Sequence, residues 1–118
     1  MLLLACCQDA EPLVSQVKIW DQDFHVIQTI DDPATLGEFT KMWNARTEVS
    51  PSERPTYSHK VDIMTDKGST RWLYDPRGYA TVLSKTMTPV YCFRNPEALN
   101  SILIPQQGAE VDAKNPAP

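Results

Sequence analysis

Apolar and polar residues alternate along residues 14–30 with the two-residue period of a half-buried β-strand. The alternation is interrupted once, by the polar run 21–23, which is typical of a turn between two strands. We therefore predict a β-hairpin here, with one buried face and one solvated face. Its apolar positions are Val17, Ile19, Phe24, Val26 and Ile30.

Two later segments change to helical spacing directly after a capping residue and a proline. Asp32-Pro33 and Asn95-Pro96 each supply a side chain that can cap free amides and a proline suited to the first helical position. Apolar residues then recur every three or four positions, which predicts helices ending near Ala45 and before Pro105. These residues are Leu36, Phe39 and Trp43 in the first helix and Leu99, Ile102 and Leu103 in the second.

Four more short strands are predicted between the helices, joined by turns with glycine or proline. The segment 47–55 carries two prolines and is predicted to be a loop. The strands cover 57–64, 71–74, 79–84 and 90–93. The expected fold is an α+β two-layer sandwich, in which an antiparallel sheet (the hairpin plus a four-stranded meander) carries both helices on one face.

The length of 118 residues favours a single domain. We assign residues 14–104 to this domain, residues 1–13 to the remnant of an export signal and a tether, and residues 105–118 to a disordered tail without apolar periodicity. The net charge of −4 and the scattered basic residues argue against a nucleic-acid surface, which needs clustered Lys and Arg.

The segment Leu3-Leu4-Ala5-Cys6 resembles the lipobox of bacterial lipoproteins, and the layout as a whole resembles small envelope lipoproteins of uncharacterised function. In that family the cysteine thiol is alkylated by a diacylglycerol and becomes the new amino terminus. The resemblance implies lipid attachment at Cys6 and a location on the periplasmic face of the cell envelope. Because the residue after Cys6 is not Asp, it implies the outer membrane. The alternative is a cytosolic domain with an ordinary apolar terminus.

No combination of residues indicates catalysis, a metal ion or a cofactor. His25 and His59 have no spacing that would gather the three or four ligands of a zinc or copper site, so we expect a solvated His25 and a hydrogen-bonded core His59. Nucleophile and phosphate-binding motifs are also missing from the sequence. Cys92 lies in an apolar run and is predicted to be a buried thiol, with a disulfide to Cys7 as the alternative.

One group of residues around the turn 75–78 has the composition of a binding surface, since Tyr, Trp and Arg are frequent anchors. It consists of Arg71, Trp72, Tyr74, Arg77 and Tyr79. The competing interpretation places Trp72 and Tyr74 against the helices, in the core.

Two functional hypotheses follow from the sequence. The first is a non-catalytic envelope domain that binds a protein or a cell-wall component. The second is a periplasmic small-ligand carrier or weak enzyme, with a concave pocket lined by Trp43, Trp72 or Tyr74.

Overall fold

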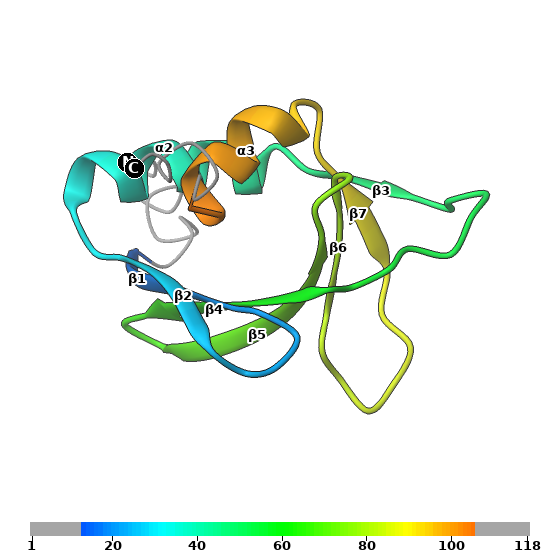
Figure 1. Cartoon of the computed structure of the whole chain (residues 1–118), viewed down its shortest axis with the longest axis horizontal. Helices are drawn as coiled ribbons and strands as arrows, with labels where there is room; N and C mark the ends of the chain where they lie inside the picture. Colours follow the sequence, from blue (N-terminus) through cyan, green and yellow to red (C-terminus); the bar gives the residue numbers. More distant parts are fainter. Residues whose placement is uncertain (1–12, 106–118) are drawn as a thin grey trace, which may run out of the picture.

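The computed structural model describes residues 13–105, which form one seven-stranded antiparallel sheet with two helices over one face (Figure 1). The spatial order of the strands is β2-β1-β4-β5-β6-β7-β3. The predicted α+β class, with a hairpin, a four-stranded meander and two helices on one face, is confirmed. The elements are β1 (Val14–Trp20), β2 (Val26–Ile30), α2 (Pro33–Asn44), β3 (Thr47–Val49), β4 (His59–Thr65), β5 (Gly68–Asp75), β6 (Tyr79–Val82), β7 (Val90–Cys92) and α3 (Pro96–Leu103).

The prediction of a loop over 47–55 was wrong for its first three residues. They form β3, which pairs with β7 at the edge of the sheet, with Thr47 opposite Cys92 and Val49 opposite Val90. Three residues are too few for an alternating pattern to be recognised, and the pairing partner lies more than forty residues later in the chain. These residues therefore form a strand because they pair with β7, which is distant in the sequence.

Two glycines make the tight turns of the meander possible. Gly68 and Gly78 have φ angles of +126° and +112°, values that side chains with a Cβ rarely adopt. A Cβ on Gly78 would also come within 3.1 Å of Pro96 at the start of α3. The turns predicted at 66–68 and 75–78 are thus confirmed, and the second one lets α3 pack closely on the sheet.

Both helices begin as predicted. The Asp32 side chain accepts a hydrogen bond from the amide of Thr35 at 2.9 Å, and Asn95 accepts one from Ala98 at 3.2 Å. Each cap satisfies one of the amides that the first turn of a helix leaves without a partner. The helices then lie beside each other across the inner face of the sheet (Figure 1).

Trp43 of α2 is the centre of the hydrophobic core. It is 3% exposed, and its indole lies 4.7 Å from the ring of Phe93, 5.0 Å from Phe39 and 5.3 Å from Trp72, measured between ring centroids. The strands contribute the floor of this core, mainly Val17, Ile19, Val61 and Ile63. Burying side chains of this size stabilises the fold by roughly 1.5–3 kcal/mol each.

The outer face of the sheet carries an unexpected buried carboxylate, Asp62, which the sequence pattern assigns to the solvated face. Arg71 donates to it through Nε at 2.7 Å and through Nη2 at 2.8 Å, and the Trp20 indole donates at 3.0 Å. These two side chains cover Asp62, so its exposed fraction falls to 8%. The hydrogen bonds from Arg71 hold the pKa of Asp62 below its usual value.

Candidate ligand-binding site

The five residues predicted to form a binding surface do not lie together on the surface. Trp72 and Tyr74 are 6% and 0% exposed and belong to the core, as the competing interpretation held. The Tyr74 hydroxyl donates to the Asn100 side chain, and burial raises the pKa of this phenol. Arg71 is held by Asp62 on the outer face. Only Arg77 and Tyr79 adjoin each other near the turn, as a guanidinium 6.0 Å from a ring centroid. The presence of aromatic residues in this part of the sequence did not show whether Trp72 and Tyr74 lie in the core or on the surface.

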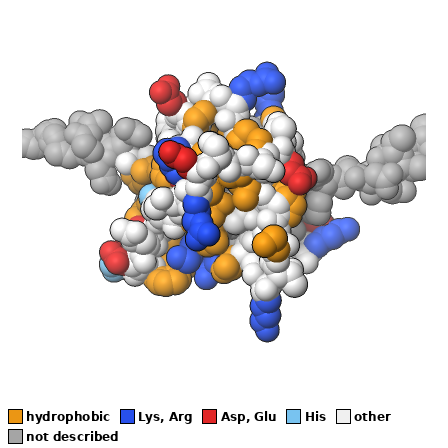
Figure 2. All heavy atoms as spheres, turned by 90° about the vertical axis from the view of Figure 1, so that its right-hand side faces the viewer, with side chains coloured by type: hydrophobic (Ala, Val, Ile, Leu, Met, Phe, Trp, Pro, Cys, Tyr) orange, Lys and Arg blue, Asp and Glu red, His pale blue; other side chains and the backbone are white. Residues whose placement is uncertain are grey.

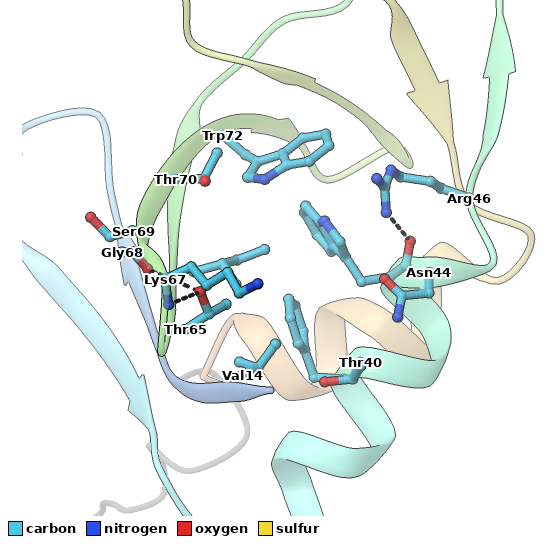
Figure 3. Close-up of a pocket in the computed structure, with 13 residues that line it drawn as sticks. Val14, Thr40, Asn44, Arg46, Thr65, Lys67, Gly68, Ser69, Thr70 and Trp72 are labelled. Carbon is cyan, nitrogen blue, oxygen red and sulfur yellow. Dashed lines mark hydrogen bonds between the residues drawn. The ribbon is translucent and has the colours of Figure 1, made fainter. Parts of the chain in front are cut away.

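A pocket of about 320 Å³ opens instead between α2 and the β4–β5 hairpin (Figure 3). This volume lies at the lower end of the range typical for small-molecule sites. Helix α2 and Arg46, two residues beyond its end, form one wall, and the two strands form most of the other. The lining residues used below are Phe39, Thr40, Trp43, Asn44, Arg46, Ile63, Lys67, Thr70 and Trp72.

The walls of this pocket combine ring faces with hydroxyl and amide groups. Phe39, Trp43 and Trp72 supply the apolar part, because the inner face of the sheet and the buried stripe of α2 meet here. Thr40, Asn44 and Thr70 supply polar groups at the rim. Seven of the thirteen lining residues are polar or charged, so this pocket is more polar than the mainly apolar sites typical of small organic ligands.

Two buried N–H donors at this pocket have no hydrogen-bond partner. They are Trp43 Nε1 and Arg46 Nε, and both atoms are shielded from solvent by the surrounding protein. More than nine in ten buried polar groups in folded proteins are paired, and each unpaired one costs about 1–3 kcal/mol. Both donors belong to side chains that line one pocket, so a ligand acceptor that reached them there would remove this cost.

Arg46 is fixed in place by three contacts. Its Nη1 donates at 2.9 Å to the Trp43 carbonyl at the C-terminal end of α2, which also accepts the backbone amide of Arg46 at 3.3 Å. Its guanidinium also lies 4.8 Å from the ring centroid of Trp72 and 4.9 Å from that of Tyr91. The guanidinium is thereby oriented between two aromatic rings, an arrangement that cation–π attraction favours.

The charge at this pocket is positive although the chain as a whole is acidic. Arg46 and Lys67 line it, and Figure 3 shows the Lys67 side chain extending into the space between the walls. No lining residue is Asp or Glu, and within residues 13–105 neither cation forms an ion pair with a carboxylate. An anionic group would therefore meet attraction without competition from a resident acid.

The sequence indicated only part of this site. Trp43 and Trp72 were named in the small-ligand hypothesis, and both line the pocket, whereas Tyr74 does not. Arg46 and Lys67 were missed because single basic residues carry no motif. A basic residue directly after the end of an amphipathic helix, as Arg46 is, was the one available signal.

The remaining titratable residues lie away from this pocket. His59 is half-buried, bonds the Ser58 hydroxyl at 2.8 Å, and has its pKa lowered by burial, as expected of a hydrogen-bonded core histidine. His25 is exposed, as predicted, but its ring lies near Asp21 and Asp23, with candidate ligand atoms within 4.8 Å of one another. Sequence reasoning did not foresee this cluster. Cys92 is a half-buried free thiol among the described residues, whereas Cys7 lies outside them.

The end of the molecule formed by β3 and β7 shows no organised site. Figure 2 looks onto this end and shows hydrophobic side chains interrupted by Lys, Arg, Asp and Glu. Leu83 and Met87, on the loop between β6 and β7, are its most exposed apolar residues. Single exposed apolar side chains are common on protein surfaces and do not by themselves indicate a binding site.

Neither described helix is both long and apolar enough to cross a bilayer. The predicted lipid attachment at Cys6 and the predicted tail 105–118, apart from Pro105, lie outside the described residues. Comparison of the chain with models of protein families, with curated proteins and with solved structures finds no match.

Proposed function

We propose that this chain is a non-catalytic binding domain of the bacterial cell envelope that holds a small organic ligand, such as a fragment of a cell-wall component, in the pocket between α2 and the β4–β5 hairpin. The observation that carries the proposal is the pair of unpartnered buried donors, Trp43 Nε1 and Arg46 Nε, which belong to two side chains that line the pocket. A ligand that supplies acceptors there recovers the cost of leaving the donors unpaired.

The chemistry of the lining supports binding rather than turnover. Within the described residues, the pocket is lined by no His, Cys, Asp or Glu, so its hydroxyl groups, such as that of Ser69, have no imidazole or carboxylate in the lining to act as their base. The cations Arg46 and Lys67 can orient an anion and attract it, but neither is paired with a group that would remove a proton from the ligand.

Blocking the pocket tests the proposal. Thr70 lines it from β5 and is exposed, so Thr70→Phe introduces a ring into the pocket without disturbing the core. We expect the full chain to bind members of a library of small carboxylates, aromatic compounds and cell-wall fragments, measured by quenching of tryptophan fluorescence. Thr70→Phe should weaken the best binder at least tenfold.

The matched control is Thr29→Phe, the same change at an exposed threonine of β2 that does not line the pocket. It should leave binding unchanged. Equal binding to wild type and Thr70→Phe, or no binding to any member of the library, would contradict the proposed site.

The envelope location has a separate test that uses Cys6. In a bacterial host supplied with the complete export signal, we expect labelled palmitate to be incorporated into the wild-type chain and not into Cys6→Ser. Cys7→Ser is the matched control and should retain the label. Absence of label from the wild-type chain would favour the cytosolic alternative and would leave the pocket unaffected.

A further inference from the structure

We infer that the ligand is a small organic carboxylate, bound through the Nε and Nη2 edge of Arg46 and the indole N–H of Trp43. This inference rests on the proposed function, because it names the ligand class of the same pocket. It is supported by how this chain uses its other arginines, by which donors Arg46 leaves unpaired, and by the shape and charge of the pocket.

Two arginines of this chain each hold a carboxylate by the same edge. Arg71 donates to the two oxygens of Asp62 through Nε and Nη2, at 2.7 and 2.8 Å. Arg77 uses the same two nitrogens less symmetrically: Nη2 donates to Oδ2 of Asp75 at 2.8 Å, and Nε lies 3.1 Å from Oδ2 and 3.3 Å from Oδ1. This side-on geometry suits a carboxylate because its two oxygens match two parallel N–H groups.

In Arg46, Nη1 already makes a hydrogen bond, whereas the Nε and Nη2 edge makes none among the described residues. Nη1 donates to the Trp43 carbonyl, whereas Nε is buried without a partner, and no hydrogen bond from Nη2 is present among the described residues. The rings of Trp72 and Tyr91 fix the plane of the guanidinium. The edge that holds a carboxylate in Arg71 and Arg77 is therefore already oriented in Arg46.

Trp43, whose side chain lines the same pocket, adds a third donor without a partner among the described residues. Its carbonyl binds Arg46, and its indole Nε1 is buried without a partner in the same pocket. Both nitrogens are shielded from water, so a carboxylate reaches them only when the half-buried Arg46 side chain, held by Trp43, Trp72 and Tyr91, moves outward. Because charge-assisted hydrogen bonds are about twice as strong as neutral ones, a carboxylate gains more here than a neutral carbonyl.

The rest of the pocket fits an apolar body attached to that anionic group. Phe39 and Trp72 present rings, and the volume of about 320 Å³ accommodates one or two fused rings or a short acyl chain. Lys67 provides a second positive charge across the pocket, and no resident acid opposes the ligand (Figure 3).

The inference is tested on the full chain with pairs of probes, each a carboxylate and the neutral methyl ketone of similar shape. The pairs are benzoate with acetophenone, 2-naphthoate with 2-acetonaphthone, and decanoate with 2-undecanone. Binding is followed by the indole N–H signals of ¹⁵N-labelled protein, which contains three tryptophans. We expect at least one carboxylate to bind roughly ten times more tightly than its neutral partner, consistent with one charge-assisted pair. The carboxylate should shift the Trp43 signal and leave that of Trp20, which already binds Asp62, in place.

Arg46→Lys keeps the charge and removes the two-pronged edge, so it should reduce the preference for the carboxylate to about twofold or less. Arg54→Lys, at an exposed arginine outside the pocket, is the matched control and should retain the full preference. Trp43→Phe is a second variant, which keeps an aromatic ring and removes the indole N–H. It should weaken carboxylate binding severalfold, and it keeps the inference testable if Arg46→Lys does not fold.

Equal binding of both members of every pair, unaffected by Arg46→Lys, would overturn the carboxylate assignment and leave the proposed pocket standing. No shift of the Trp43 signal with any of the six probes would overturn the carboxylate assignment. If the pocket-blocking experiment with Thr70→Phe also showed no binding, the proposed function would fail with it.

Discussion

Replacing Trp43 with alanine is expected to lower the free energy of unfolding by about 3–5 kcal/mol, the usual cost of truncating a buried tryptophan. This indole is 3% exposed and contacts the rings of Phe39, Trp72 and Phe93, so its removal leaves a cavity at the point where α2, the sheet and the segment before α3 meet. Total stabilities of single domains are about 5–15 kcal/mol, so the variant would lose a large share of its stability. Urea unfolding of the full chain measures the effect.

Trp43→Phe provides the control for this prediction. It keeps an aromatic ring among the same neighbours and removes the indole N–H, which has no partner within the described residues. The lost N–H contributes no hydrogen bond, but the smaller ring leaves part of the indole volume empty, so we expect a cost of about 1–2 kcal/mol, below that of alanine. If alanine and phenylalanine had equal effects, Trp43 would not be the centre of the core described here.

The second large effect is expected for Asp75→Ala, at about 2–4 kcal/mol. Asp75 is 2% exposed, and its carboxylate accepts hydrogen bonds from the amides of Thr56 and Arg77 and from the Arg77 guanidinium. Its loss removes the acceptors of two partly buried amides and disconnects the segment before β4 from the turn 75–78. Thermal and urea unfolding measure the cost, and Glu38→Ala, at an exposed carboxylate of α2, should stay within about 0.5 kcal/mol of wild type.

The same residue gives a direction to the pH dependence of stability. Burial pushes the pKa of Asp75 upward, but hydrogen bonds from Arg77 and from the Thr56 and Arg77 amides outweigh it and hold the pKa below the ordinary value of 3.8. Since the folded pKa lies below the unfolded one, the carboxylate stabilises the fold above pH 3.8, and this contribution disappears as the pH falls through the folded pKa. The stability difference between wild type and Asp75→Asn should therefore shrink below about pH 4. A constant difference down to pH 2 would contradict this account.

Most of the fold could be predicted because its signals are local. Asp32 and Asn95 cap their helices through neighbours three residues away, and Gly68 and Gly78 adopt the φ angles that their turns need. β3 could not be predicted, because its three residues become a strand only through the distant β7. The burial of Asp62 was also missed, because it results from Arg71 and Trp20 on neighbouring strands rather than from the period of β4.

The site was less predictable than the fold because it, too, depends on contacts between residues that are distant in the sequence. Tryptophans such as Trp43 and Trp72 could be proposed as pocket residues from their type, but their type fits the core equally well. The property that distinguishes this pocket is a pair of donors without acceptors, Trp43 Nε1 and Arg46 Nε. Whether a donor is satisfied depends on the positions of all surrounding atoms, which no spacing along the chain encodes.

The position of β1 has a consequence for the order in which the chain folds. β1 is hydrogen-bonded on one side to β2, which follows it directly, and on the other to β4, with Val14 opposite Thr65. Pairing β1 with β4 closes the segment 21–58, and closing so long a segment costs more chain entropy than forming the adjacent β1–β2 hairpin. During synthesis, the amino-terminal hairpin is therefore complete well before its partner strand exists. We therefore expect the pairing of β1 with β4, which joins this hairpin to the β4–β5 hairpin, to follow the formation of both hairpins.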